Sequence, residues 1–331
     1  MSRDIVFWKT IAIVSVIGMV VIAIYAFCII CNKSDHFVNE HREWYLHRGD
    51  VEIFVQEYGS GTDTVIVIHG GFGANHDYMI DAVRGLERQF HFVFYDQRGS
   101  LLSPTAKENL TFQKNIDDLY GLIRALGLDS VKLLGHSMGS LVAMEFTEQH
   151  PDLVSHIVLV GAIAPKLDNE YFLRIHNSNS FLSSRQAVLD LRKPYEEKGI
   201  LNVLSGQQRI RDSEFTHKDL TEYWRIGFAA TNIYDMSKVH KVRGGRAYFK
   251  PEAAVMQNTV NWDFDYREIL NSKNTTIING EYDFLDLYSE HLKAILVEYP
   301  NINLIIMPKA GHNPWIDNPD LFRKHLQNAL K

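Results

Sequence analysis

Three side chains that lie far apart in the chain could together perform nucleophilic catalysis: the hydroxyl of Ser137, the carboxylate of Asp283 and the imidazole of His312. A serine hydroxyl is a weak nucleophile until a neighbouring base takes its proton, and the base works best when an acid orients it. These residues occur in the order serine, acid, histidine, which is typical of enzymes whose serine lies between a strand and a helix. We therefore expect Ser137, Asp283 and His312 to form a catalytic triad.

The residues around Ser137 predict a sharp turn. The sequence Gly135-His136-Ser137-Met138-Gly139 stands between an apolar run at 131–134 and a helical pattern at 138–149. Such a turn crowds the neighbouring side chains, so glycine is favoured two positions before and after the serine. The helix that follows also places partial positive charge near the serine oxygen, where negative charge develops during acyl transfer.

A glycine-rich segment at 69–73, with the sequence HGGFG, follows another apolar run at 64–68. We expect the backbone N–H of Gly71, with Phe72 as the second choice, to join the N–H of Met138 in an oxyanion hole. The alternative interpretation is an ordinary turn between a strand and a helix. A phosphate-binding G-x-G-x-x-G loop is not formed, because Asn75 and His76 occupy the later positions.

Asp283 and His312 each follow an apolar run, at 276–278 and 304–306. Asp286 is the rival acid, but we expect it to begin the next helix, where a carboxylate complements the helix dipole. Among the 15 histidines, His69 and His136 also stand in motif positions, and we expect them to support loops rather than transfer protons. We expect His312 to be the base, because it follows the serine and the acid in the chain order typical of these enzymes.

The elements that must position these residues form an alternating pattern. Unbroken β-branched runs predict strands that are buried on both faces of a mostly parallel sheet, with helices covering both faces. Ligands of such sheets bind at the carboxyl ends of the strands, where all three candidates stand. The expected strands are 64–68, 92–95, 131–134, 157–160, 276–278 and 304–306, the expected helices are 76–89, 113–126, 138–149 and 286–298, and a hairpin is expected at 44–46 and 51–55.

Composition and patterning also predict the domain organisation. Residues 11–31 include no charged side chain, and a helix of this length would span roughly 30 Å, the thickness of a bilayer core. We predict an N-terminal membrane anchor over 1–33, a tether over 34–44 and a folded domain over 45–331. A helical cap is expected at about 165–255, where strong strand patterns are missing. These features predict a single-pass membrane protein that contacts lipid through this helix and whose catalytic domain lies outside the cytoplasm.

Composition excludes several classes of protein. The chain has 331 residues and a net charge of −6, whereas nucleic-acid binding proteins usually carry a basic surface. Its two cysteines, Cys28 and Cys31, are too few for a disulfide framework or a zinc site. No metal ion and no organic cofactor is required by the predicted chemistry.

These motifs resemble the α/β-hydrolase superfamily. Within it, the sequence YDQRGS at 95–100 is similar to the D-Q-R-G-S signature of proline iminopeptidases and the related tricorn-interacting aminopeptidases, as are the segments 261–263, 278–283 and 311–319. The resemblance covers roughly 45–331 and implies a cap that covers the active site and selects the substrate. It also implies that acidic cap residues bind the free α-amino group of a peptide, and Glu222 and Glu252 are the candidate counterparts.

The chain departs from that group at two places. Phe72 replaces the proline of H-G-G-P-G, and His136 and Met138 replace the residues of G-G-S-W-G, as in many esterases and lipases. The DQRGS stretch nevertheless favours an aminopeptidase acting on small peptides. The alternative is a carboxylesterase or a lipase of the monoacylglycerol type that acts on esters near a membrane. A third interpretation, less favoured because the triad is intact, is an inactive binding protein on the same fold. The oligomeric state is not predicted.

Overall fold

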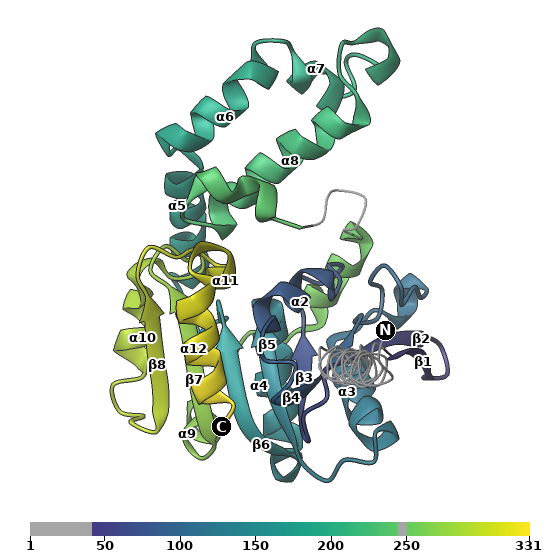
Figure 1. Cartoon of the computed structure of the whole chain (residues 1–331), viewed down its shortest axis with the longest axis vertical. Coiled ribbons are helices and arrows are strands. Elements are labelled where there is room, and N and C mark those ends of the chain that lie inside the picture. The colour runs from purple at the N-terminus through teal and green to yellow at the C-terminus, as the bar shows by residue number, and fades with distance from the viewer. Residues whose placement is uncertain (1–41, 244–249) are drawn as a thin grey trace, which may run out of the picture. The chain divides into compact units, whose positions relative to one another are not determined.

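The centre of the protein is an eight-stranded sheet with the strand order β1-β2-β4-β3-β5-β6-β7-β8 (Figure 1). The structure is a computed structural model and describes residues 42–243 and 250–331. Its strands are β1 (Arg42–His47), β2 (Glu52–Tyr58), β3 (Asp63–Ile68), β4 (Phe90–Tyr95), β5 (Val131–His136), β6 (Val154–Val160), β7 (Asn274–Gly280) and β8 (Ile302–Met307).

Neighbouring strands from β4 to β8 are parallel, whereas β1 and β2 are antiparallel additions at one edge. The mostly parallel sheet predicted from the apolar runs is therefore confirmed. Val65, Val67 and Ile68 of β3 have no exposed surface, because helices cover both faces of the sheet. Since β3, β5, β7 and β8 run in the same direction, the loops that follow them leave the sheet at one edge.

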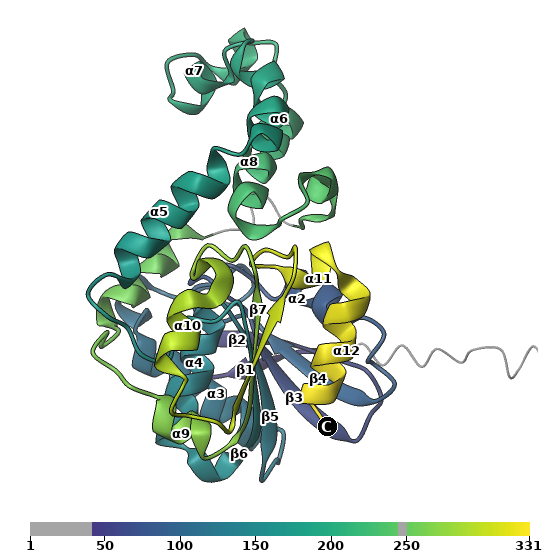
Figure 2. The same ribbon diagram turned by 90° about the vertical axis from the view of Figure 1, so that its left-hand side faces the viewer.

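Helices pack on both faces of the sheet, as Figure 2 shows: α2 and α12 cover one face, and α3, α4, α9 and α10 cover the other. Two clusters of buried apolar side chains, one on each face, form the core. The helices outside the cap are α2 (Asp77–Val83), α3 (Phe112–Ala125), α4 (Met138–Gln149), α9 (Arg267–Asn271), α10 (Glu290–Ile295), α11 (Pro314–Asp317) and α12 (Pro319–Ala329).

A group of helices lies between β6 and β7 in the sequence and stands beyond the carboxyl edge of the sheet (Figures 1 and 2). The predicted cap at about 165–255 falls in this stretch. Its longest helix, α8, begins with a capping box in which Thr216 and Asp219 satisfy each other's backbone N–H groups. The elements are α5 (Tyr171–Ser183), α6 (Gln186–Glu196), α7 (Ile200–Leu204), η3 (Ile210–Asp212), α8 (His217–Asn232), η4 (Met236–Lys241) and η6 (Pro251–Thr259).

Two predicted helices are shorter than the sequence pattern indicates. The helix expected at 76–89 ends at Val83, because Arg84 is extended and Gly85 has a φ of 88°. The helix expected at 286–298 is divided, because Tyr288 and Ser289 adopt φ angles of 60° and 52°. A periodic apolar pattern does not detect such backbone reversals, since it depends only on which side chains are buried.

The helix predicted to cross a membrane, at 11–31, lies outside the described residues, as do the rest of the predicted anchor and most of the tether. Within 42–243 and 250–331, no helix is long and apolar enough to traverse a bilayer; the longest, α8, has 16 residues, whereas a crossing takes about 20. The predicted localisation, a single-pass membrane protein with an extracytoplasmic catalytic domain, is corrected on this finding. Neither an anchor nor a lipid contact is assigned.

The loop after β4, which contains the DQRG sequence, is held by buried polar contacts. The Asp96 carboxylate accepts hydrogen bonds from His76 Nδ1 (2.7 Å) and from the Leu102 N–H (2.9 Å). The Arg98 guanidinium donates two bonds of 2.8 Å to the carboxylate of Asp118 on α3. These residues connect the loop beside the carboxyl edge to the helices around it.

The Arg98–Asp118 pair generates a prediction about stability. Both residues are at most 2% exposed, so Arg98→Leu removes both short hydrogen bonds from a buried carboxylate, which keeps only the longer contact with Arg48 (3.7 Å) among the described ion pairs. It is expected to lower the free energy of unfolding by about 3–5 kcal/mol. The double variant with Asp118→Leu removes the buried carboxylate as well and is expected to recover most of that loss. Urea unfolding of both variants measures the effect, and an Arg98→Leu variant within about 1 kcal/mol of wild type would contradict it.

Candidate active site

Ser137 stands at a strained turn between β5 and α4. Its φ of 55° and ψ of −126° are rare for a residue with a side chain, and such conformations cost about 1–3 kcal/mol unless the surroundings fix them. Here the Ser137 N–H donates to the Val160 carbonyl of β6 (3.0 Å), and its own carbonyl accepts from the Ser140 N–H (2.9 Å). The turn predicted from the glycine spacing is present.

Close packing behind the turn requires small residues. A Cβ on Gly139 would lie 2.3 Å from the Ile68 carbonyl oxygen at the end of β3. A Cβ on Gly161, which has a φ of 52°, would lie 2.7 Å from Nδ1 of His312. There is therefore no room for a side chain at Gly139, where the end of β3 meets the serine turn, or at Gly161, where the end of β6 meets His312.

His312 and Asp283 form a buried pair. Nδ1 of the imidazole lies 2.9 Å from each carboxylate oxygen. Asp283 has no exposed surface, and His312 is 2% exposed. Because both acceptors are carboxylate oxygens, Nδ1 carries the proton and Nε2 is left as the basic nitrogen. The rival acid, Asp286, instead accepts bonds from the His291 and Leu292 N–H groups at the start of α10.

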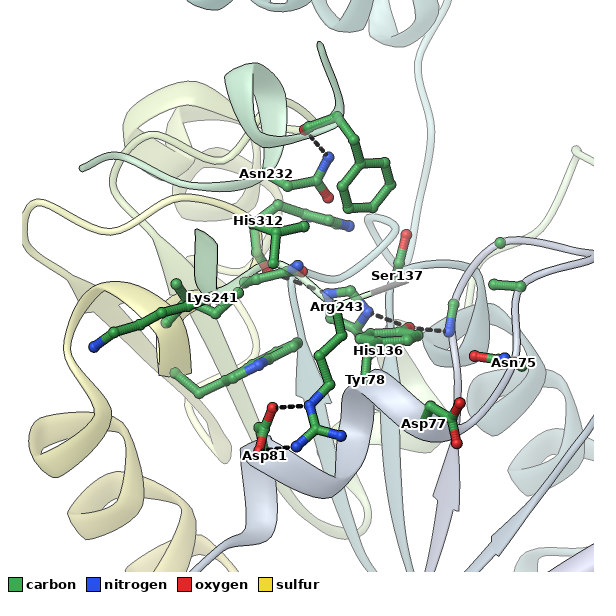
Figure 3. A pocket seen from close by; sticks show the side chains of 18 of the residues that line it. Asn75, Asp77, Tyr78, Asp81, His136, Ser137, Asn232, Lys241, Arg243 and His312 are labelled. Carbon is green, nitrogen blue, oxygen red and sulfur yellow. Dashed lines mark hydrogen bonds and ion pairs between the residues drawn. The ribbon is translucent and has the colours of Figure 1, made fainter. Parts of the chain in front are cut away.

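Ser137 and His312 line the same cavity at the carboxyl edge of the sheet (Figure 3). No hydrogen bond between the Ser137 hydroxyl and the His312 ring is present in the described structure. In unliganded enzymes such bonds are often long and shorten only when a substrate is bound. The structure thus brings the three predicted residues to one place, with the acid and base already paired.

The loop at 69–73 passes beside Ser137. Among the described residues, none accepts a hydrogen bond from the N–H groups of Gly71, Phe72 or Met138, so all three donors are available. Gly71 also lines the cavity. The adjacent Gly70 N–H is not available, since it donates to the Tyr78 hydroxyl (2.6 Å).

His136 connects this loop to the histidine loop. Its Nε2 lies 3.1 Å from the His312 carbonyl and its Nδ1 lies 2.8 Å from the Tyr78 hydroxyl. Since a carbonyl can only accept, Nε2 carries the proton and Nδ1 accepts from the tyrosine. Burial, reinforced by nearby His312, holds the pKa of His136 well below its usual value, so the ring is neutral. His69 is buried in the loop, where it accepts a bond from the Gln97 N–H (3.0 Å).

The cap is bonded directly to the histidine loop through Asp317. Its buried carboxylate accepts from the N–H groups of Tyr234 (2.9 Å) and Asp235 (2.9 Å), just after α8, and from the Gly311 N–H (2.8 Å). Arg185 holds the same turn from the cap side by donating to the carbonyls of Ala230, Ile233 and Tyr234. The position of His312 therefore depends on where α8 ends.

The cavity between the sheet and the cap holds about 250 Å³ and has mostly apolar walls. Trp224 and Phe228, four residues apart on α8, stack with ring centroids 5.1 Å apart. The apolar wall consists of Trp224, Phe228, Val242, Phe284, Trp315 and Ile316. Such a lining favours an apolar group on the substrate.

Neither predicted amino-group ligand lines this cavity. Glu222 lies two positions before Trp224, on a different face of α8, and is paired with Arg225 (2.5 Å). Glu252 is exposed at the start of η6. The acids that do reach the cavity are Asp77, which is half exposed, and Asp81, which is paired with Arg84 and Arg243.

The structure adds residues that sequence reasoning did not identify: Tyr78, Asp317 and the cavity-lining asparagines 75, 232 and 313. Asp317 and Asn313 belong to the quoted segment 311–319, so their nearness to His312 in the chain was the available signal. Tyr78 and Asn232 carry no such signal, because only the folded chain brings them to the site. Among the described residues, no cluster of His, Cys, Asp or Glu could hold a metal ion.

Comparisons with known proteins agree with this fold. A family model described as the alpha/beta hydrolase fold matches residues 63–319. A 2-(acetamidomethylene)succinate hydrolase of Mesorhizobium japonicum is 24% identical over 90% of this chain and 96% of its own length. A proline iminopeptidase of Xylella fastidiosa is 26% identical over 76% of this chain and 83% of its own. The structure of an esterase from Exiguobacterium antarcticum superposes with a TM-score of 0.61 at 18% identity, covering 87% and 99% of the two chains.

The buried neutral state of His136 predicts a pH dependence of stability. Its folded-state pKa is depressed, so below about pH 6.5 the unfolded chain binds a proton that the folded chain does not. Wild-type protein is therefore expected to lose stability relative to His136→Gln as the pH falls from 7 to 5, by up to about 1.4 kcal/mol per pH unit. Urea unfolding at several pH values tests this, and parallel curves for the two proteins would contradict it.

Proposed function

The chain belongs to the alpha/beta hydrolase family, and from this premise we propose that it is a serine hydrolase that cleaves uncharged carboxylic esters with an apolar substituent. The observation that carries the proposal is the buried Asp283–His312 pair beside Ser137 in a cavity with apolar walls. The resemblance to proline iminopeptidases is confirmed by relatives at the level of the family.

In the proposed mechanism, Ser137 Oγ attacks the ester carbonyl while Nε2 of His312 takes its proton. Asp283 holds the imidazole through Nδ1 and stabilises the cation that forms. The N–H groups of Met138 and of Gly71 or Phe72 bind the oxyanion, each contributing about 3 kcal/mol in comparable sites. His312 then gives its proton to the departing alkoxide. In the second half, His312 takes a proton from water, which attacks the acyl-enzyme, and returns it to Ser137 Oγ.

The charges in the cavity argue against a cationic substrate. An ammonium group in a site of low dielectric constant needs a carboxylate partner, because an unpaired buried charge is costly. Glu222 and Glu252 do not supply it, Asp81 is already neutralised by two arginines, and Asp77 is half exposed to solvent. The stacked rings on α8 instead offer an apolar surface to the substrate.

An aminopeptidase is the second candidate. It is favoured by the DQRGS sequence and by the proline iminopeptidase relative. Within 42–243 and 250–331, Asp77 is the carboxylate at the cavity without an arginine or lysine partner, so it would be the group that binds an α-ammonium.

Covalent labelling tests the nucleophile. A fluorophosphonate probe is expected to modify wild-type protein and not Ser137→Ala, because the probe reacts with an activated serine oxygen. Ser140→Ala is the matched control, since it removes the neighbouring hydroxyl, which donates to the Ser137 carbonyl (2.5 Å), and should still be labelled. Intact-mass spectrometry reads the adduct, and equal labelling of wild type and Ser137→Ala would reject the assignment.

A matched pair of substrates separates the two candidate functions. Phenyl cyclopentanecarboxylate and the phenyl ester of proline share a leaving group and ring size and differ in the ammonium charge. We expect kcat/KM for the proline ester to be about 100-fold lower, because the carboxylate open to its charge is the half-exposed Asp77 and not a buried partner. A preference for the proline ester that Asp77→Asn abolishes would replace the esterase proposal with the aminopeptidase.

A further inference from the structure

Two asparagine side chains, Asn232 from the end of α8 and Asn313 from the histidine loop, line the cavity next to His312. They are neighbours, since the Asn313 N–H donates to the Asn232 carbonyl (2.8 Å). Asn232 is 6% exposed and Asn313 is 3% exposed. Carboxamides buried to this degree normally have hydrogen-bond partners.

The Asn313 side chain has none among the described residues. Its Oδ1 is buried without a partner, and its Nδ2 makes no hydrogen bond to 42–243 or 250–331. Asn313 occupies the N-cap position of α11, where an asparagine oxygen would ordinarily accept from the first turn, but the side chain makes no capping bond. A purely local structural role therefore does not account for it.

Of the two polar groups of the Asn232 carboxamide, only the NH2 group has hydrogen-bond partners among the described residues. Its Nδ2 donates to the Phe228 carbonyl (2.8 Å) and to Thr231 Oγ1 (3.1 Å), which fixes the orientation of the group. Its Oδ1 accepts no hydrogen bond from the described residues. Figure 3 shows this side chain above His312, on the cap side of the gap between His312 and Ser137.

We propose that Asn232 and Asn313 form a substrate subsite that binds an uncharged amide group. Asn232 Oδ1 would accept from the amide N–H, and Asn313 Nδ2 would donate to the amide carbonyl. A neutral group with one donor and one acceptor thus pairs with the open oxygen of Asn232 and the open amide N–H of Asn313 without bringing a charge into the cavity. Leaving these two groups unpaired in the buried site costs about 1–3 kcal/mol each, and a bound amide offsets this cost.

The subsite lies on the leaving-group side of the reaction. Both asparagines adjoin His312, and this histidine gives its proton to the departing oxygen. The inference rests on the proposed ester hydrolysis and deepens it: the preferred esters carry an amide within reach of the alcohol oxygen. Hydrolysis of such an ester by water yields the carboxylic acid and the amide-bearing alcohol.

Three acetate esters separate the contributions of the amide N–H and the amide carbonyl. The first is 2-acetamidoethyl acetate, which has both groups. In 4-oxopentyl acetate a methylene replaces the N–H, and pentyl acetate lacks both polar groups. All three share the acyl group, so deacylation is common to them. Titration of released acid gives kcat/KM. For Asn313→Leu we expect the value for 2-acetamidoethyl acetate to fall about tenfold, with less than a twofold change for pentyl acetate.

Asn75→Leu is the matched control, because Asn75 is also a cavity-lining carboxamide with no described hydrogen bond, located on the β3 loop. It should leave the preference for the amide ester unchanged. Equal losses for all three esters in Asn313→Leu, or the same selective loss in Asn75→Leu, would overturn the subsite.

Binding without turnover separates failure of the subsite from failure of the proposed function. In a Ser137→Ala background, calorimetric titration is expected to show tighter binding of 2-acetamidoethyl acetate than of pentyl acetate, and loss of that difference with Asn313→Leu. Hydrolysis of none of the esters by wild type would reject the esterase proposal, while the binding difference would still support the subsite. Equal affinities for the two esters would overturn it.

Discussion

The buried carboxylate of Asp283 constrains the site more than any other group. It has no exposed surface, and its stabilising contacts are the N–H of Leu285 (2.9 Å) and Nδ1 of His312. An isolated carboxylate in the interior is costly, so the fold is most stable when the imidazole lies against it. That contact fixes the tautomer of His312 and leaves Nε2 free at the cavity, where the strained turn presents Ser137.

The cap takes part in positioning this histidine. Asp317 accepts N–H bonds from the residues after α8 and from Gly311, and a Cβ on Gly311 would lie 2.8 Å from Cα of Ile233. On the other side, His136 and Tyr78 connect the His312 carbonyl to the loop that carries Gly71. His312 and the loop that carries Gly71 are thus held by one continuous set of contacts, so a change in the cap can shift both without touching Ser137.

Next to His312 the cavity is lined by neutral groups, Asn232, Asn313 and His136, beside aromatic walls. Its charged residues are Asp77, Lys241 and the paired Asp81 and Arg243. The DQRGS loop does not line this cavity, because Asp96 and Arg98 bond to His76 and Asp118.

The sequence by itself determined the sheet, the turn at Ser137 and the candidate triad, because strand patterning and glycine spacing are local and the carboxyl ends of parallel strands meet at one edge. It could not determine the breaks at Gly85 and Tyr288, since backbone reversals leave no apolar period. The tertiary structure alone decided that Glu222 and Glu252 do not line the cavity while Asn232 and Tyr78 do. Helix orientation and long-range packing set which side chains face the serine, and neither is encoded in the spacing of any one segment.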